Sequence, residues 1–268
     1  MKATSRTGIL GVIGWPIKHS RSPAMQNAAL ESLGADLVYL AFAVPDGKLP
    51  MAIAGARSLG VRGLNVTVPH KQSVMALCQP DELARKVGAV NTLSFDGDVV
   101  RGSNTDVHGF RMMLDEAGGM TPGRVVILGA GGAAHAIVAA LEGLATHITS
   151  VSRSGHRVPG AEHAAWPTNA ADTRALLDGA SLLVDATPRG LADDAAAFDV
   201  AALPPHALVL DLVVKRETPI VRAARARGLR ASNGAAMLLH QGAASLERWL
   251  GRPAPLEVMR AALDASLE

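Results

Sequence analysis

Residues that could transfer a proton stand in the segment Asn65-Val66-Thr67-Val68-Pro69-His70-Lys71. The alternation of a strand puts Asn65 and Thr67 on one face. Pro69 suits the first position of a helix, which would place Lys71 in the first turn. The helix dipole there opposes a cation and favours the neutral amine that a general base needs. From these residues alone, an exposed lysine just past a turn is the simpler interpretation.

Asp106, Ser20 and Ser22 can each be interpreted in two ways, as part of a helix start or as part of a binding site. Asp106 directly precedes a helical pattern, so its ordinary role is that of an N-cap. The same position would aim the Asp106 carboxylate into a cleft, where this anion would hold Lys71 in place. Ser22 precedes a proline and could also be an N-cap. Together with Ser20 it could instead cradle a substrate carboxylate at a helix N-terminus.

A glycine-rich turn follows the apolar strand pattern at 125–128, with the sequence Gly129-Ala130-Gly131-Gly132-Ala133-Ala134. In a dinucleotide-binding turn of this kind, Gly129 permits the tight turn and Gly131 lets the backbone approach a pyrophosphate. Ala134 packs the helix against the strand, and the helix N-terminus offers N–H groups to the phosphates. A plain strand-to-helix corner is the alternative interpretation.

The next strand pattern ends at Ser152-Arg153-Ser154, roughly 20 residues past the glycine turn, where a dinucleotide fold selects its cofactor. An acidic residue there would accept bonds from the ribose 2′-hydroxyl and repel a 2′-phosphate. This segment holds no acid, and Arg153 with its flanking hydroxyls offers donors to a phosphate. The segment therefore predicts NADP rather than NAD, against the alternative of a surface loop that contains an arginine.

Strand and helix patterns alternate along the chain, which predicts an α/β fold with parallel, doubly wound sheets. Strands are expected at 9–13, 37–43, 64–68, 125–128, 148–152, 182–185 and 208–213. Helices are expected at 23–33, 49–59, 69–77, 106–117, 133–144, 170–177, 219–227, 234–250 and 256–267. A hairpin over 89–101 should turn at Asp96-Gly97. The helix at 106–117 is the expected bridge between two domains, and no strand pattern follows the last two helices.

The composition bounds the class of protein. The 268 residues are 49% hydrophobic, enough for a large core in one or two domains. The near balance of 26 Lys and Arg against 24 Asp and Glu does not favour a nucleic-acid surface. With one cysteine, and no histidine pair at a spacing of three to five, we expect neither a disulfide framework nor a metal site. The chain has no signal-peptide core and no apolar run of membrane-spanning length, which predicts a cytoplasmic protein.

Taken together, these segments resemble the shikimate dehydrogenase family over nearly the whole chain. Several motifs in a fixed order carry the resemblance: Gly14-x-Pro16-Ile17-x-His19-Ser20-x-Ser22-Pro23 with Asn27, Asn65-Val66-Thr67-x-Pro69-x-Lys71, Gly88-Ala89-Val90-Asn91-Thr92, Asn104-Thr105-Asp106-x-x-Gly109, the Gly129 turn, Asp185-Ala186-Thr187-Pro188-x-Gly190 and Asn233-Gly234-x-x-Met237-x-x-x-Gln241.

The resemblance implies an NADPH-dependent enzyme that reduces 3-dehydroshikimate to shikimate on the way to aromatic amino acids. It also implies a role for individual residues. Lys71 and Asp106 would be the catalytic pair. Hydroxyl and carboxylate groups of the substrate would be bound by Ser20, Ser22, Thr67, Asn91, Asp106 and Gln241. NADP would be bound by Gly129, Ala130, Gly131, Gly132, Ala133, Ser152, Arg153 and Ser154, with Leu212 and Gly234 by the nicotinamide.

The resemblance also implies two domains. An N-terminal α/β substrate domain would comprise residues 1–106 and 241–268, because the family returns its last helices to this domain. A Rossmann-type NADP-binding domain would comprise residues 107–240. The chain would act on its small-molecule substrate as a monomer or a homodimer, without a nucleic acid or a membrane.

Two departures from the family pattern bear on the substrate and the cofactor. The family motif Asp-x-x-Tyr is here Asp211-Leu212-Val213-Val214, so the tyrosine that normally meets the substrate has no counterpart. Asp185 replaces the usual asparagine and introduces a carboxyl at a strand end. Because of the first departure, an alternative is that this chain is a related dehydrogenase that acts on quinate or on a modified shikimate. An NADP-binding regulatory protein without turnover is a further alternative, against which the intact Lys71 and Asp106 argue.

Overall fold

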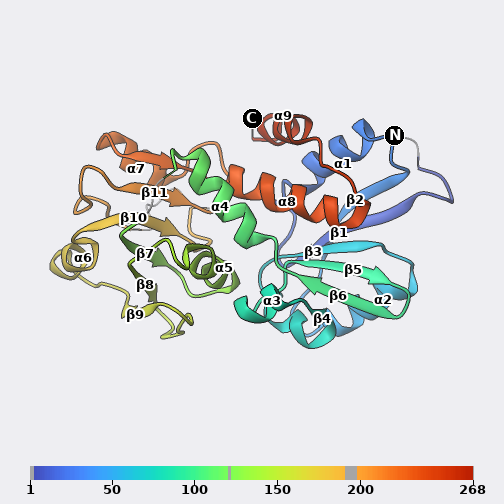
Figure 1. Cartoon of the computed structure of the whole chain (residues 1–268), viewed down its shortest axis with the longest axis horizontal. Coiled ribbons are helices and arrows are strands. Elements are labelled where there is room, and N and C mark those ends of the chain that lie inside the picture. Colours follow the sequence, from blue (N-terminus) through green and yellow to red (C-terminus); the bar gives the residue numbers. More distant parts are fainter. Residues whose placement is uncertain (1–2, 120–121, 191–197, 268) are drawn as a thin grey trace. The chain divides into compact units, whose positions relative to one another are not determined.

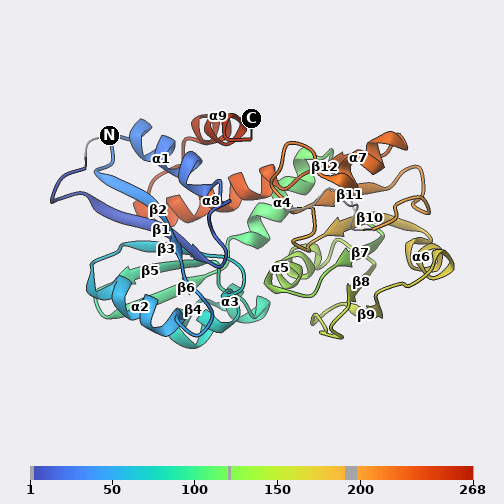
Figure 2. The same ribbon diagram turned by 180° about the vertical axis from the view of Figure 1, so that it is seen from behind.

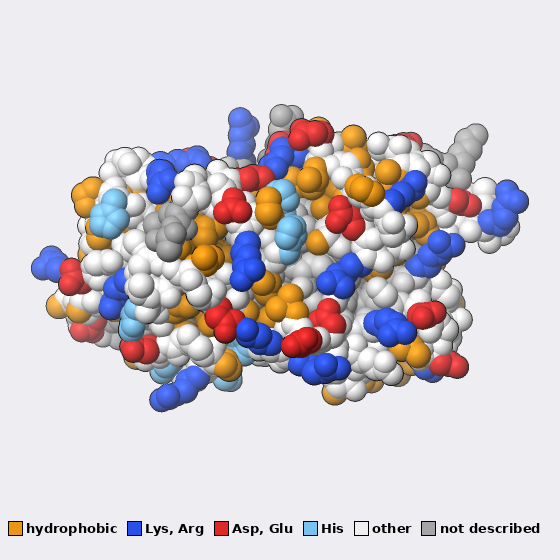
Figure 3. Space-filling model, viewed as in Figure 1, with side chains coloured by type: hydrophobic (Ala, Val, Ile, Leu, Met, Phe, Trp, Pro, Cys, Tyr) orange, Lys and Arg blue, Asp and Glu red, His pale blue; other side chains and the backbone are white. Residues whose placement is uncertain are grey.

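The computed structural model describes residues 3–119, 122–190 and 198–267. The chain divides into two compact units, the first comprising Met1–Gly109 with Leu239–Glu268 and the second Phe110–Leu238. Each unit contains its own β-sheet (Figures 1 and 2). Among the described residues, no helix is long and apolar enough to cross a membrane. On the face drawn in Figure 3, basic and acidic side chains lie interspersed.

The described residues of the first unit form a six-stranded sheet of mixed direction, in the order β2-β1-β3-β5-β6-β4. Its strands are β1 (Gly8–Gly14), β2 (Leu37–Ala43), β3 (Gly63–Val66), β4 (Gln79–Pro80), β5 (Thr92–Asp96) and β6 (Val99–Ser103). Strands β2, β1 and β3 run parallel, whereas β5 and β6 form the predicted antiparallel hairpin. Asn27 lies in the helix that follows β1, and its side-chain amide bonds both the N–H and the carbonyl of Tyr39. These bonds hold that helix against β2.

Helices from both ends of the chain belong to the first unit. They are α1 (Ser22–Ser32), α2 (Leu49–Ser58), the 3₁₀ helix η1 (Ser73–Leu77), α3 (Glu82–Val87) and α9 (Leu256–Ala265), together with the first turn of α4 (Asp106–Glu116) and most of α8 (Ala235–Leu250). Helix α9 packs against α1, and Trp249 of α8 donates its indole N–H to the Leu93 carbonyl at 3.0 Å. The return of the last helices to the N-terminal part is thus confirmed.

The second unit has an entirely parallel sheet in the order β12-β11-β10-β7-β8-β9. Its strands are β7 (Arg124–Leu128), β8 (His147–Ser152), β9 (Glu162–Ala165), β10 (Ala180–Asp185), β11 (Leu208–Asp211) and β12 (Arg230–Ser232), and its further helices are α5 (Gly132–Leu141), α6 (Ala170–Leu177) and α7 (Pro219–Ala226). Read from β9, this is the 3-2-1-4-5-6 order of a Rossmann fold, and β7 is the strand at which the order reverses. The predicted fold class is confirmed.

Several local predictions for the first unit need correction. The helix expected over 69–77 is absent from the described residues, since 68–72 form turns and η1 begins only at Ser73. The hairpin turns at Gly97-Asp98 instead of Asp96-Gly97, because Asp96 still pairs with Val99 and Gly97 has the positive φ of +58° that the turn requires. Strand β4 and helix α3 were not expected.

Candidate functional site

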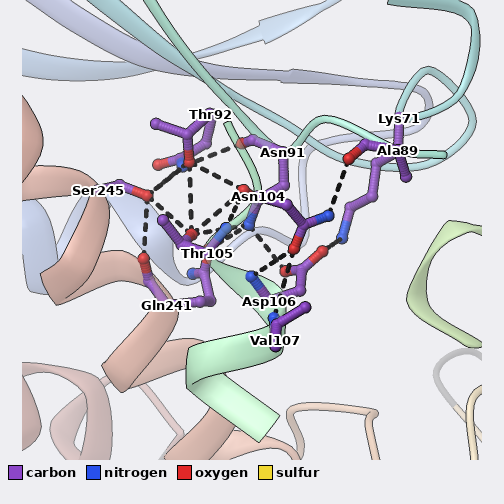
Figure 4. A network of polar contacts seen from close by, with 11 residues as sticks. Lys71, Ala89, Asn91, Thr92, Asn104, Thr105, Asp106, Val107, Gln241 and Ser245 are labelled. Carbon is purple, nitrogen blue, oxygen red and sulfur yellow. Dashed lines mark hydrogen bonds and ion pairs between the residues drawn. The ribbon is translucent and has the colours of Figure 1, made fainter. Parts of the chain in front are cut away.

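A buried ion pair joins two of the predicted residues in the first unit. Lys71 Nζ lies 2.8 Å from Asp106 Oδ2, and the two side chains are 15% and 4% exposed (Figure 4). A lysine ammonium has three N–H donors, and the ion pair uses one of them. Because little water reaches the pair, each charge depends on the other for its stability.

Asn91 holds the second oxygen of this carboxylate. Its Nδ2 donates to Asp106 Oδ1 at 2.8 Å and to Thr105 Oγ1 at 2.9 Å, and it lies 3.3 Å from Gln241 Oε1. Its Oδ1 accepts from the Thr105 backbone N–H at 2.8 Å. Both Asn91 and Gln241 are buried. Four of the predicted residues, Lys71, Asn91, Asp106 and Gln241, are therefore joined by direct bonds.

Asp106 is not the N-cap that the sequence suggested. It is the first residue of α4, and Asn104 Oδ1 accepts from the backbone N–H groups of Asp106 at 3.0 Å and Val107 at 3.3 Å. Because Asn104 satisfies the first amides of the helix, the Asp106 carboxylate is available to bond Lys71 and Asn91. Sequence reasoning missed Asn104, although an asparagine two residues before a helix is a recognisable cap.

Lys71 also reaches the site in a different way from the one predicted. It lies in a turn, two residues before η1, so the helix-dipole argument for a neutral amine has no structural basis. The turn is fixed by longer-range bonds. The Lys71 carbonyl accepts from the Val90 N–H at 2.8 Å, and the buried His70 ring lies 2.7 Å from the Val44 carbonyl. These bonds aim Lys71 at Asp106 without a helix.

A second layer of hydroxyls and amides supports this group (Figure 4). Among its residues, Ser245 was missed from the sequence. Ser245 of α8 lies one helical turn after Gln241, and its Oγ lies 2.8 Å from Thr92 Oγ1 and 3.2 Å from Thr105 Oγ1. Asn65 Nδ2 donates to Ser245 Oγ at 2.9 Å. The sequence does not single out Ser245, because the side chains that it bonds, those of Asn65, Thr92 and Thr105, are more than 100 residues away.

Ser22 connects to this layer, but not as an N-cap. Arg21 occupies the N-cap position of α1 with no side-chain cap bond, and Ser22 is the first helical residue. The buried Ser22 side chain hydrogen-bonds the Tyr39 phenol, whose O–H donates to Asn65 Oδ1 at 2.7 Å. Ser20 stands beside it, since its Oγ accepts from the Ser22 N–H at 3.4 Å. The N-cap interpretation of Ser22 is therefore wrong.

Thr67 lies just beyond the end of β3. Its N–H donates to the Ile13 carbonyl of β1 at 2.9 Å, and a Cβ added to Gly14 would overlap its methyl group. The half-buried Thr67 thus stands where β1 gives way to the loop that leads to Ser20 and Ser22.

The glycine turn of the second unit follows β7, the central strand. Gly129 has a φ of +112°, and a Cβ there would lie 3.2 Å from the Ala186 carbonyl, so the turn itself requires glycine. Gly131 is the N-cap residue of α5 with a φ of −87°, which any residue adopts, and a Cβ there would meet no heavy atom of the described chain within 4 Å. Ala134 is fully buried where helix and strand meet.

The loop after β8 presents the predicted cation. The buried Ser152 hydroxyl lies 3.0 Å from Ser154 Oγ, which lies 2.7 Å from His156 Nδ1. Arg153 is exposed, and its Cζ lies 5.8 Å from the centroid of the Trp166 ring. The loop combines the exposed Arg153 with two hydroxyls, a set of donors that suits a phosphate.

Leu212 and Gly234 come together at the start of α8. The Gly234 N–H donates to the Val213 carbonyl at 3.0 Å, and a Cβ at Gly234 would overlap the Leu212 carbonyl. Only glycine permits this close approach of two backbone segments.

Two buried carboxyls lie side by side at the ends of β10 and β11, where Asp185 and Asp211 are register partners. Asp185 Oδ1 accepts from the N–H and hydroxyl of Thr187, while its Oδ2 has no partner among the described residues. Burial raises the pKa of Asp185. Burial likewise raises the pKa of Asp211 to about 6, against hydrogen bonds from Thr218 and Val213. Burial thus disfavours the charged form of Asp185, the residue that stands where the family has an asparagine.

The arrangement defines a class of protein. The first unit contains a lysine–carboxylate pair suited to proton transfer at a carbonyl or hydroxyl oxygen. The second contains a Rossmann sheet whose glycine turn and helix N-terminus suit a dinucleotide. No cluster of three or more His, Cys, Asp or Glu among the described residues could hold a metal. These are the parts of a dinucleotide-dependent dehydrogenase of the α/β type.

Comparison with known proteins gives the family. Residues 12–93 match the model described as the shikimate dehydrogenase substrate binding domain, and residues 234–263 match the shikimate 5′-dehydrogenase C-terminal domain. The chain is 43% identical to the shikimate dehydrogenase (NADP⁺) of Thermosynechococcus vestitus, over 99% of this chain and 98% of that one. It is 44% identical to the corresponding protein of Symbiobacterium thermophilum, over 97% and 95%.

A solved structure agrees with this similarity. The shikimate 5-dehydrogenase of Thermus thermophilus, crystallised in complex with NADP(H) and shikimate, superposes with a TM-score of 0.86 and 33% identity, over 97% of this chain and 100% of that one. The chain belongs to the shikimate dehydrogenase family.

Proposed function

We propose that this chain catalyses the reversible NADPH-dependent reduction of 3-dehydroshikimate to shikimate, with the first unit as substrate domain and the second as cofactor domain. The buried Lys71–Asp106 pair is the observation that carries the proposal, because it provides a proton donor and acceptor in a family of NADP-dependent dehydrogenases. The relatives' names favour shikimate over quinate or a modified shikimate, and the intact pair argues against a regulatory protein without turnover.

Lys71 and Asp106 would handle the proton. Reduction adds a hydride to the carbonyl carbon and a proton to its oxygen, and bound NADPH supplies the hydride. The Lys71 ammonium donates the proton to the oxygen, and the resulting amine regains a proton from solvent. In the reverse direction the amine accepts the hydroxyl proton. Asp106 holds Lys71 Nζ at 2.8 Å and so keeps it in position.

The substrate would be bound by polar groups of the first unit. We assign the substrate carboxylate to Ser20 and Ser22 at the start of α1, where helix N–H groups favour an anion. The ring hydroxyls would be bound by Thr67, Asn91, Asp106 and Gln241. Bonds within the network hold the Asn91 amide in place, which lowers the entropic cost of binding.

The cofactor would be bound by the second unit, whose residues fit NADP. The pyrophosphate would lie on the turn from Gly129 to Ala133, because the open space beside Gly131 is not used by the chain itself. Ser152, Arg153 and Ser154 would bind the 2′-phosphate. The backbone at Leu212 and Gly234 would border the nicotinamide.

A substrate panel run with NADP and NAD in parallel tests the proposal. We expect NADPH formation from shikimate with a higher kcat/KM than from quinate, and higher with NADP than with NAD. The absence of NADPH formation from shikimate, while another polyol acid turns over well, would overturn it. The missing tyrosine after Asp211 would then explain the altered substrate.

The family assignment also supports a cytoplasmic enzyme that acts as a monomer or a homodimer. Light scattering of the purified chain, with and without NADP, would measure its oligomeric state.

A further inference from the structure

Trp166 stands at an edge of the second unit where its neighbour is Arg153. Strands β8 and β9 are adjacent and parallel, and Ser152 pairs with Ala165 as the last residues of the two strands. Arg153 and Trp166 are therefore the first residues beyond the paired ends. They lie at the carboxyl edge of the sheet, where open α/β sheets bind their ligands.

The two side chains are in contact. The guanidinium carbon of Arg153 lies 5.8 Å from the Trp166 ring centroid, within the range of a cation–π interaction. Arg153 itself is exposed, and its loop hydroxyls bond each other and His156. Among the described residues, the indole is thus the group that orients this exposed cation.

Trp166 is itself fixed by packing. It is partly buried against the core of the second unit, and its ring meets Phe198 edge-on with centroids 5.5 Å apart. An aromatic ring held in this way is a rigid support, whereas a free arginine side chain loses much rotamer entropy when it binds. Stacking on the ring restricts the arginine before a ligand arrives.

We infer that Trp166 is a positioning residue for recognition of the 2′-phosphate, and that through Arg153 it contributes to the preference for NADP over NAD. The inference rests on the proposed function only in its assignment of Arg153 to the 2′-phosphate. It requires neither a particular substrate nor turnover.

Nucleotide fragments allow a test by calorimetry without turnover. Adenosine 2′,5′-bisphosphate carries the 2′-phosphate, and 5′-AMP lacks it. We expect Trp166→Ala to weaken binding of the bisphosphate about two- to fivefold, the range of an exposed cation–π contact, and to leave 5′-AMP within twofold. Trp166→Phe, which keeps an aromatic face and much of the packing volume, should recover most of the loss.

A double-mutant cycle separates positioning from general structural damage. In the Arg153→Ala background, Trp166→Ala should cause no further selective loss of the bisphosphate, because the ring acts through the guanidinium. An equal loss for both nucleotides, or a selective loss that persists without Arg153, would overturn the inference. So would an Arg153→Ala variant with unchanged bisphosphate affinity.

The outcome is distinguishable from failure of the proposed function. A chain that does not oxidise shikimate but shows the expected cycle would keep the role of Trp166 and lose only the substrate assignment. Fluorescence gives a second readout, since Trp166 is the one tryptophan of the sequence between residues 110 and 238. We expect the bisphosphate to change the emission of the wild-type chain and not that of Trp166→Phe. Identical changes in both would contradict the inference.

Discussion

The two units offer their ligands different kinds of surface. In the first, functional side chains are buried and bonded to one another, as in the group formed by Lys71, Asn91 and Asp106. In the second, the predicted binding groups are backbone beside Gly131 and an exposed Arg153. A fixed polar network suits a reaction whose charges must be stabilised without rearrangement. An open turn and an exposed arginine suit reversible recognition. We therefore propose that the first unit carries the chemistry and the second selects the cofactor.

The largest expected effect comes from removal of the proton donor. Lys71→Ala should lower kcat for shikimate oxidation by at least about 10³-fold, near the upper part of the range for general acid–base groups. The KM for NADP should change little. Steady-state kinetics measure both, and Lys48→Ala, at an exposed lysine in the same unit, is the matched control. A comparable loss in the control would remove the special role of Lys71.

The second prediction concerns pH and the buried carboxyls of the second unit. The pKa of Asp211 is about 6 in the folded chain against an ordinary 3.8, so the folded state binds this proton more tightly than the unfolded state. Its contribution to stability is complete below about pH 3.8 and is lost as the pH rises through 6. The loss should be at most roughly 3 kcal/mol.

Calorimetric melting of wild type and Asp211→Asn between pH 4 and 7 measures this contribution. The asparagine keeps an oxygen for the Val213 N–H and removes the titrating group. The variant should gain stability relative to wild type as the pH rises. A difference in Tm that stays constant across this range would contradict the prediction.

Removal of Asn91 should destabilise the first unit and its reaction together. Asn91→Ala removes the hydrogen bonds of this buried amide to Asp106 Oδ1, to the Thr105 hydroxyl and to the Thr105 backbone N–H, which should lower the free energy of unfolding by about 2–3 kcal/mol. Chemical denaturation and kcat should both report the loss. A variant of unchanged stability would mean that this network is not the rigid element described above.

Removal of Arg153, unlike that of Asn91, should weaken cofactor binding and leave stability unchanged. Arg153→Ala should raise the KM for NADP about 10- to 100-fold, as expected for loss of hydrogen bonds to a charged group, and change the KM for NAD less than twofold. Its Tm should equal that of wild type, because the side chain is exposed. The exposed Arg174 of α6 provides the matched control. Equal effects on both cofactors would end the 2′-phosphate assignment.

Local sequence patterns were sufficient for much of the second unit. Apolar strands, the glycine turn and Pro219 at a helix start are encoded by neighbouring residues, and the observed strands β7, β8, β10 and β11 follow them. Failures came where distant residues decide. Pro69 and the apolar residues after it favour a helix, but bonds from the Val90 N–H to the Lys71 carbonyl and from the His70 ring to the Val44 carbonyl fix a turn instead. Tertiary bonds overrode local propensity there.

In the candidate site, too, residue types could be predicted from the sequence, whereas contacts between distant residues could not. Lys71 and Asp106 could be singled out by residue type and family motif, whereas their direct bond depends on the fold. The supporting role of Ser245 could not be found, because helix α8 returns from the far end of the chain to bond Asn65, Thr92 and Thr105. The role of Asn104 could be predicted from the sequence, because an asparagine shortly before a helix is a recognisable cap.

A single-turnover experiment with saturating NADP and shikimate tests the division between chemistry and recognition most directly. We predict that Lys71→Ala slows NADPH formation at least about 10³-fold, while Arg153→Ala, once saturated, forms NADPH at the wild-type rate. A wild-type rate in Lys71→Ala would contradict the account.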